Sequence, residues 1–478
     1  MIVTTHSHPA DLGVAEAATL LTRRKLSSVE LTRACLERIR DRDGRHNAEG
    51  DPRSINAWVR VYEEDALAAA AQADRMLAGG ATTPLCGIPI GLKDLYAVAG
   101  KPLTASSRLL EEAPQKDCDV WARLRAAGMV LLGHLHTHEF AAGGTTDQTG
   151  NPWDLTRTPG GSSGGSAAAL AARMVAAATG TDTAGSLRIP SACCGTSTLK
   201  PTRNFVSLRG IVPLCQSLDH AGPMARTLRD CALLFEHMVG ADAGRAESAI
   251  PRTRLRIAPR AKVRPLEGVR LAVSPRIALR VAPEAGVAAR FEALLELAQR
   301  MGAKLVAFPG TDLPLDVFDD YTAVFGADML AWHRRFDDRR HLYRASTREF
   351  VEAGEKRALS GWEYAQAQAR RRLATALWSE RFAAERIDAL VEPTLPVVAP
   401  RRGWGYDHAF ADAMLIELTH YWNWTGFPVA AFPCGLDTSS GLPVGASLIG
   451  RAGSDARLLE IGIALQDELG VPAPALVS

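Results

Sequence analysis

The chain has 478 residues, of which 47% are hydrophobic and 23% are charged. This is ordinary globular composition on a chain long enough to bury a large core, which excludes an intrinsically disordered protein. The 55 basic and 53 acidic residues leave a formal charge of +2, and this balance argues against a dedicated nucleic-acid binder or a protein that binds anionic membranes.

The first eighty residues have the pattern of a helical segment. Ser27 and Glu30 form a capping box ahead of apolar residues at helical spacing. The alanine-rich stretch Glu63–Ala78 ends at Gly79 and Gly80, which is a typical helix stop. This part of the sequence therefore predicts a helical N-terminal segment.

From residue 84 to residue 240, short apolar runs alternate with helical stretches. The expected strands are Ile88–Leu92, Met129–Leu132 and Val175–Ala178, and the expected helices are Asp119–Ala127 and Ser166–Met174. Such alternation is typical of an α/β sheet, with glycine concentrated in the connections.

The second half of the chain continues the pattern after a polar stretch at 241–265, where prolines and arginines indicate a surface crossing within one domain. Val269–Val273 and Lys304–Phe308 predict strands on either side of a helix at Ala285–Met301. The region 316–425 is helical and rich in aromatic residues. Aromatic side chains are core in most proteins, but such a cluster can also line an apolar substrate pocket.

Several features indicate a cytoplasmic protein. The N-terminus has no basic stretch followed by an apolar one, so no secretory signal is expected. The most apolar long stretch, Ser166–Gly180, contains Arg173 and is too short to span a bilayer. The eight cysteines are dispersed without a CxxC pair, which favours buried free thiols over disulfides or a zinc site.

Two glycine- and serine-rich turns, Pro159–Ser166 and Gly180–Pro190, flank an alanine-rich helix. Glycine lets backbone N–H groups approach a ligand closely, and a serine hydroxyl can attack a carbonyl carbon if a base removes its proton. No lysine follows the glycines as a phosphate-binding loop requires. The turns therefore predict nucleophilic chemistry rather than nucleotide binding.

One interpretation of the first turn is a nucleophile elbow, because GxSxG matches at both Ser162 and Ser163. That interpretation needs a histidine late in the chain, and His408 or His420 could serve. It would make the protein an esterase with an α/β-hydrolase fold.

Two further motifs carry ionisable groups. Lys93 ends an apolar run, is bracketed by glycines and is followed at once by an acid, so its amine could point into a site. His134, His136 and His138 alternate, and on a strand they would share one face as a possible metal cluster. Buried or surface histidines without a metal are the simpler interpretation.

Taken together, these segments resemble the amidase signature family. The stretch GGSSGGSAAALAA, followed by GTDTAGS-RIP, is the hallmark of that family, and the upstream GIPIGLKD is its lysine motif. HEFAAGGT, NPWD and SLDHAGPM match as well, as does GLPVG near the C-terminus. The resemblance is strongest from about 85 to 235 and covers most of the chain.

The resemblance implies an α/β fold, with a large mixed β-sheet covered by helices on both faces. It implies a single amidase domain over residues 1–478. Its expected parts are a helical N-terminal segment (1–80), a signature core (84–240), the surface crossing (241–265) and a helical substrate-pocket region (316–425).

The resemblance also implies a Ser–cisSer–Lys triad with Ser186 as nucleophile, Ser162 as bridging serine and Lys93 as base. The peptide bond before Ser162 is expected to be cis. The oxyanion hole would be formed by the backbone N–H groups of Thr183, Ala184, Gly185 and Ser186. The supporting residues would be Gly161, Ser163, Asp182 and Arg188. The resemblance implies neither a metal nor a cofactor, and it therefore makes a metal site at the three histidines less favoured.

The sequence departs from the family pattern at three positions. Ala184 replaces a common glycine, Arg173 stands where glycine is frequent at a helix end, and His136 replaces a frequent asparagine. The methyl group of Ala184 is expected to be tolerated if its φ is negative. None of the three changes removes a catalytic group, so they bear on substrate choice.

The proposed base sets a requirement on its surroundings. A lysine with its reference pKa of about 10.4 is neutral in less than about one molecule in a thousand at pH 7, which would add about 4–5 kcal/mol to the barrier. Burial lowers that pKa. We therefore expect Lys93 to be buried and largely neutral when it acts.

The resulting prediction is an amidase that hydrolyses a small carboxylic amide, with an aryl or apolar acyl group, to an acid plus ammonia or an amine. Two related alternatives stay open: the glutaminase component of a tRNA-dependent amidotransferase and an allophanate-type hydrolase. The expected partner is a small-molecule amide, without nucleic acid or membrane, and a homodimer is an open option.

Overall fold

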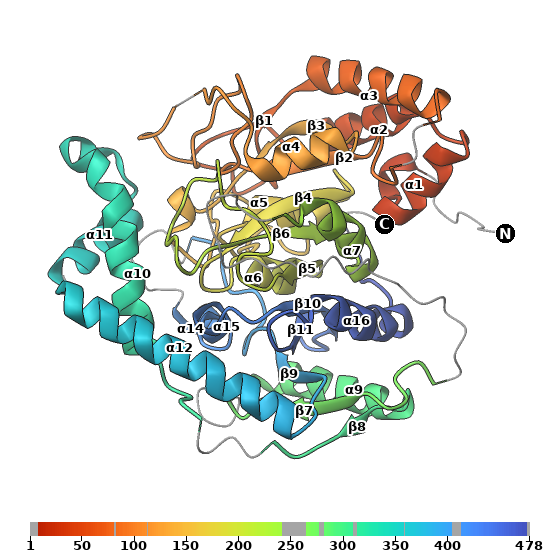
Figure 1. The fold of residues 1–478 in the computed structure, drawn as a ribbon. Coiled ribbons are helices and arrows are strands. Elements are labelled where there is room, and N and C mark those ends of the chain that lie inside the picture. Colours follow the sequence, from red (N-terminus) through yellow and green to blue (C-terminus); the bar gives the residue numbers. More distant parts are fainter. Residues whose placement is uncertain are drawn as a thin grey trace.

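The structure is a computed structural model that describes residues 8–80, 83–111, 113–240, 264–276, 282–308, 313–357, 359–403 and 413–475. One mixed sheet of eleven strands runs through it, in the order β1-β3-β2-β4-β6-β5-β10-β11-β9-β7-β8. In Figure 1 the strands follow one another from β1 near the top to β8 near the bottom. The strands are β1 (Trp58–Val61), β2 (Pro89–Lys93), β3 (Val130–Leu135), β4 (Ala177–Asp182), β5 (Ser197–Lys200), β6 (His220–Ala225), β7 (Arg270–Val273), β8 (Lys304–Leu305), β9 (Ala389–Pro393), β10 (Val429–Leu436) and β11 (Pro443–Ile449).

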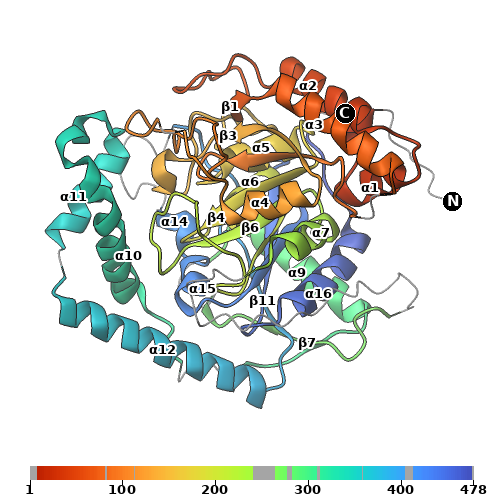
Figure 2. The same ribbon diagram turned by 45° about the horizontal axis from the view of Figure 1, so that its top comes forward.

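Helices cover both faces of this sheet (Figure 2). They are α1 (Val14–Thr22), α2 (Ser28–Arg42), α3 (Glu63–Ala78), α4 (Asp119–Ala126), α5 (Gly164–Ala171), α6 (Arg188–Cys194), α7 (Leu228–Met238), α9 (Ala285–Arg300), α10 (Phe318–His333), α11 (Ala345–Lys356), α12 (Gly361–Ala384), α14 (Ala413–Ile416), α15 (His420–Thr425) and α16 (Asp455–Leu469). The expected α/β fold with a large mixed sheet is confirmed.

Two strands lie where the sequence predicts helix. β1 falls inside the N-terminal segment and pairs antiparallel with β3, and β9 falls inside the region 316–425 and pairs with β7 and β11. Each has only four or five residues, which is too short for a period to separate strand from helix, so pairing across the sheet decides the conformation. The crossing predicted at 241–265 lies almost wholly outside the described residues, and the single-domain assignment stays a prediction.

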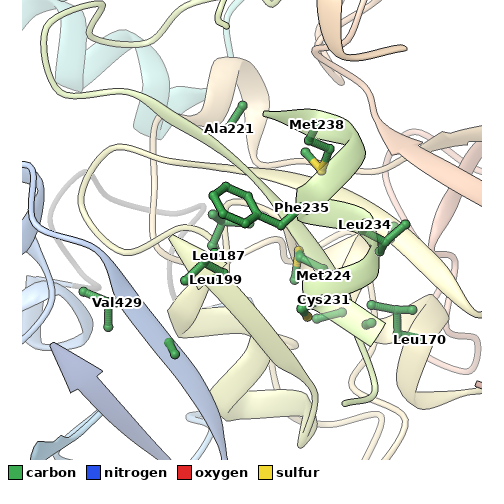
Figure 3. Packing of buried hydrophobic residues seen from close by; sticks show 14 of the residues in the cluster. Leu170, Leu187, Leu199, Ala221, Met224, Cys231, Leu234, Phe235, Met238 and Val429 are labelled. Carbon is green, nitrogen blue, oxygen red and sulfur yellow. The ribbon is translucent and has the colours of Figure 1, made fainter. Parts of the chain in front are cut away.

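The centre of the sheet has a gap that a leucine fills. Gly180 of β4 and Gly222 of β6 are cross-strand partners. A Cβ on Gly180 would lie 2.6 Å from Leu187 Cδ2, and a Cβ on Gly222 would lie 2.6 Å from Leu187 Cδ1. Figure 3 shows Leu187 packed with Leu199 and Phe235 in the core beneath α7. The residue that follows Ser186 is thus anchored in the core, which fixes the position of Ser186.

Helices α10, α11 and α12 stand together at one side of the sheet (Figures 1 and 2). α10 packs against α11 and α12, and it also contacts α15. Within the described part of the chain, no helix is long and apolar enough to cross a membrane.

Candidate active site

The residues that the sequence proposes for the triad come from one edge of the sheet. Lys93 is the last residue of β2, and Asp182 ends β4, the parallel neighbour of β2. Ser162 lies in the loop before α5, and Ser186 lies in the loop between β4 and α6. Because the carboxyl ends of neighbouring parallel strands lie at the same edge, residues far apart in the sequence come together there.

The amine of Lys93 is completely buried among three hydroxyl groups. Its Nζ lies 2.7 Å from Ser162 Oγ, 2.9 Å from Ser163 Oγ and 2.8 Å from Thr181 Oγ1. A neutral amine has two N–H groups and one lone pair, so one of these hydroxyls donates to it. The Ser163 hydroxyl donates instead to the Thr181 carbonyl, 3.3 Å away. The arrangement therefore lets Ser162 direct its proton at the lone pair of Lys93.

Burial lowers the pKa of Lys93 to about 7, against the opposing attraction of the Asp219 and Asp182 carboxylates. The burial predicted for Lys93 is confirmed. Near pH 7 a substantial fraction of the amine is therefore neutral, and this is the form that can accept a proton. The large barrier of an exposed lysine is nevertheless removed.

The peptide bond between Gly161 and Ser162 is cis, as the family resemblance implies. The Ser162 carbonyl accepts hydrogen bonds from the His138 N–H and the Thr146 hydroxyl, both at 3.0 Å. A Cβ on Gly161 would lie 2.1 Å from the carbonyl oxygen of Thr145. A side chain at position 161 would therefore push this loop away from Lys93.

Hydrogen bonds from two distant hydroxyl groups to backbone carbonyls hold the loop that carries Ser186. The Thr183 carbonyl accepts from the Tyr321 hydroxyl at 3.0 Å, and the Ala184 carbonyl accepts from the Thr419 hydroxyl. The positive φ of the loop, +145°, falls at Gly185, whose Cβ would lie 2.4 Å from Thr419 Oγ1. The methyl group of Ala184 is therefore tolerated. These two hydrogen bonds fix the backbone of the loop. The assignment of its N–H groups, from residue 183 to residue 186, to an oxyanion hole stays a prediction.

A buried ion pair braces the same loop. Arg188 donates to both carboxylate oxygens of Asp182, at 2.9 and 3.0 Å, and both side chains are fully buried. The Leu187 N–H and the Asn423 side chain also donate to this carboxylate, at 3.1 and 2.8 Å. Burial alone would raise the pKa of Asp182, but the charge and hydrogen bonds of Arg188 outweigh it and the pKa lies below its usual value.

Replacing Arg188 with leucine is expected to lower the free energy of unfolding by about 3–5 kcal/mol, because it leaves the Asp182 carboxylate buried without its cation. Chemical denaturation measures the change. Arg229→Leu, which breaks a half-exposed pair with Asp467, is the matched control and should cost less than about 1 kcal/mol. Equal losses in the two variants would show that the buried pair has no special role.

Three contacts at the site escape sequence reasoning. Thr181 contacts the amine of Lys93, Asn423 contacts Asp182, and Asp219 accepts from the Thr183 hydroxyl at 2.5 Å. Burial raises the pKa of Asp219 to about 6, although its hydrogen bonds, among them the one from Thr183, and the charge of Lys93 act in the opposite direction. Thr181 and Asp219 lie inside motifs that resemble the family, and this position in the sequence could have indicated that they belong to the site. Asn423 lies outside the motifs, so nothing in the sequence indicated its role.

The side chains of the three alternating histidines contact different groups. His134 contacts the Tyr62 hydroxyl at 2.8 Å and the Tyr96 carbonyl at 3.0 Å. His136 and His138 are buried, and burial lowers the pKa of each to about 3. Across the described ranges, no group of three or more His, Cys, Asp or Glu side chains could hold a metal ion.

Of the two histidines in the esterase alternative, His420 lies among the described residues. The hydroxyls of Ser162 and Ser163 contact Lys93. His420 is buried and its Nδ1 lies 2.7 Å from the Ile416 carbonyl. His408 lies outside the described residues. This environment favours a lysine-based over a histidine-based relay.

A pocket of about 580 Å³ opens in front of Ser186. One wall is the loop with Thr183 and Ala184, and another is formed by α10 and α11. The lining is mostly alanine, glycine and larger apolar side chains. The nucleophile candidate therefore faces a cavity of the size that binds small organic ligands.

The chain is similar to curated proteins that are components of a larger enzyme. It is 37% identical to a glutamyl-tRNA(Gln) amidotransferase subunit of Roseiflexus castenholzii over 486 residues, 95% of each chain. It is also 38% identical to the corresponding protein of Chloroflexus aggregans. The expectation of a small-molecule amide as sole partner, without nucleic acid and with at most a second copy of the chain, is wrong. These relatives are, by name, parts of an enzyme that acts on a tRNA.

Solved structures give the same picture of the fold. Peptide amidase from Stenotrophomonas maltophilia superposes with a TM-score of 0.77 at 28% identity, covering 98% of this chain and 99% of that one. The glutamyl-tRNA(Gln) amidotransferase subunit from Thermotoga maritima has a TM-score of 0.77 at 29% identity and covers 99% of each chain. A family model named Amidase matches residues 30–459. The chain is therefore a member of the amidase signature family of amidohydrolases.

Proposed function

We propose that this protein hydrolyses the C–N bond of a carboxylic amide through an acyl-enzyme on Ser186. The observation that carries the proposal is the fully buried amine of Lys93, with its pKa near 7, placed 2.7 Å from Ser162 Oγ. A base with a pKa close to the working pH is the most effective proton acceptor for such a step. Membership of the amidase signature family supports the same chemistry.

In the proposed mechanism, the neutral amine of Lys93 accepts a proton from Ser162, and Ser162 accepts one from Ser186. The Ser186 oxygen attacks the amide carbon, and the carbonyl π electrons move to oxygen. The backbone N–H groups of residues 183–186 stabilise that oxyanion, and each such donor is worth about 3–4 kcal/mol when removed.

Collapse of this intermediate needs a proton on the departing nitrogen, because an amine anion is a poor leaving group. Ser162 donates that proton and recovers one from Lys93. Water then enters, gives a proton to the same relay and attacks the ester carbon, which releases the acid and restores Ser186. The mostly apolar pocket supports an apolar or aryl acyl group.

A second candidate is the glutaminase activity of an amidotransferase component, in which ammonia released from glutamine passes to a tRNA-linked substrate on partner proteins. The identity of 37% to a protein of that name over 95% of both chains favours it. Ammonia release from free glutamine by the purified chain, with and without added partner proteins and tRNA, tests this candidate. Turnover of uncharged amides but not of glutamine under all these conditions would reject it.

The cytoplasmic location expected from the sequence remains part of the proposal. The eight cysteines are all buried free thiols, which supports a reducing compartment.

The nucleophile is tested by labelling the protein with a fluorophosphonate and mapping the modified peptide by mass spectrometry. This reagent reports an activated serine without requiring the natural substrate. We expect an adduct on Ser186 that is absent in the Lys93→Met variant. An adduct on Ser162 or Ser163 would assign the nucleophile to the first turn and contradict the proposed relay.

A further inference from the structure

The loop between β4 and α6 has three consecutive peptide units whose carbonyl groups are held in different ways. The Tyr321 hydroxyl donates to the Thr183 carbonyl at 3.0 Å, and the Thr419 hydroxyl donates to the Ala184 carbonyl. The Gly185 carbonyl accepts instead from two N–H groups in the first turn of α6, at 2.8 and 2.7 Å. The third unit is thus fixed locally, whereas the first two depend on side chains that lie 138 and 235 positions further along the chain.

A hydrogen bond to a carbonyl also fixes the direction of the next N–H group. A peptide unit is planar, and in the trans form its C=O and N–H bonds point in opposite directions. The Tyr321 hydroxyl therefore sets the direction of the Ala184 N–H, and the Thr419 hydroxyl sets that of the Gly185 N–H. Both N–H groups belong to the predicted oxyanion hole.

The two hydroxyl groups are themselves held in place. Both residues are buried, and the Tyr321 ring makes a T-shaped contact with the His420 ring, with the centroids 5.1 Å apart. The Thr419 carbonyl accepts from Arg188 at 3.0 Å, and the same guanidinium donates to both carboxylate oxygens of Asp182. Asp182 precedes the loop and Arg188 follows it, so their ion pair also fixes the residue that contacts the middle of the loop.

Donors with a fixed direction have their largest effect in the transition state. They cost no reorganisation when the oxyanion forms, and removing one donor lowers kcat by about 10²–10³-fold. A hydroxyl that donates to the carbonyl also polarises the peptide unit and strengthens its N–H group as a donor. Without the hydroxyl, the N–H group remains but is neither directed nor polarised, so we expect a smaller loss, of about 10- to 100-fold.

We propose that the hydroxyl groups of Tyr321 and Thr419 are positioning groups for the oxyanion hole. Tyr321 directs the N–H of Ala184, and Thr419 directs the N–H of Gly185. The proposal rests on the acyl-enzyme mechanism given above. It makes stabilisation of the oxyanion depend on α10 and on the residue before α15, which lie far from the signature motifs in the sequence.

The test measures the rate at which a fluorophosphonate modifies Ser186 in Tyr321→Phe and Thr419→Val, which remove the hydroxyls and keep the shapes of the side chains. In this reaction the serine oxygen forms a bond to phosphorus, fluoride leaves, and the phosphoryl oxygen takes negative charge where a substrate oxyanion would lie. We expect kinact to fall by about 10- to 100-fold in each variant, with KI unchanged. Thr419→Ser keeps the hydroxyl and should recover most of the rate.

Two further measurements distinguish positioning from a general effect on the fold. Thr198→Val removes another buried threonine hydroxyl, which donates to the Pro223 carbonyl at 2.8 Å in the β5–β6 region, and it should keep the wild-type kinact. The pH midpoint of labelling, expected near the Lys93 pKa of about 7, should be the same in all these variants, because the relay is left intact.

Unchanged kinact in both hydroxyl variants would overturn the proposal. Equal losses in Thr198→Val, or no recovery in Thr419→Ser, would also overturn it by showing a general effect of changing a buried threonine. A shifted pH midpoint would do the same by placing the hydroxyls in the proton relay. Failure of the wild-type protein to label at Ser186 would instead reject the proposed hydrolase mechanism, whereas wild-type labelling with unchanged variants rejects only the positioning role.

Discussion

Replacing Ser186 with alanine is expected to lower kcat for amide hydrolysis by about 10⁴-fold or more, because no acyl-enzyme can then form. The loss corresponds to at least about 5 kcal/mol of transition-state stabilisation. KM should change little, since the apolar walls of the pocket remain. Steady-state kinetics on an anilide substrate measure the effect.

Ser191→Ala is the matched control for that variant. Ser191 lies on α6, a few residues beyond Ser186, and its buried hydroxyl finds no hydrogen-bond partner among the described residues. Its loss should leave kcat unchanged. Residual activity above about one per cent in Ser186→Ala would contradict a covalent role for Ser186 and return attention to Ser162 or Ser163.

Replacing Lys93 with methionine is expected to lower kcat by about 10³-fold, because the relay loses the base at its end while the apolar stem keeps its volume. The relevant control is Lys200→Met. Lys200 is the other lysine among the fully buried large side chains, and its amine donates to the Pro201 carbonyl instead of to a serine. Comparable losses in both variants would indicate a general effect of removing a buried charge, not a base at position 93.

The same lysine sets the expected pH dependence of the wild-type enzyme. Only the neutral amine can accept a proton, so kcat/KM should level off about one pH unit above the Lys93 pKa of about 7 and fall about tenfold per unit well below it. Removing the nearby negative charge in Asp219→Asn should lower that pKa further and move the acidic limb to lower pH. Full activity well below neutrality in the wild-type protein would rule out Lys93 as the base.

The sequence alone was sufficient for the α/β class, for the boundaries of elements such as α3, and for naming Lys93, Ser162 and Ser186. Periodicity and capping are local properties that neighbouring residues establish, so α3 could be located from Glu63 to Ala78 without any tertiary information. The family motifs likewise lie in continuous stretches of chain. Their roles in catalysis stay predictions until the variants are measured.

Local patterns could not give the contacts that come from distant parts of the chain. The strands β1 and β9 are too short to be distinguished by period, and their conformation depends on partners elsewhere in the sheet. Asn423 reaches Asp182 across 241 positions of sequence. The pocket in front of Ser186 likewise exists only because α10 and α11 come together with the loop that carries Thr183 and Ala184. Each of these features is a relation between surfaces that only the folded chain brings together, and so only the tertiary structure decided the surroundings of Lys93 and the shape of the pocket.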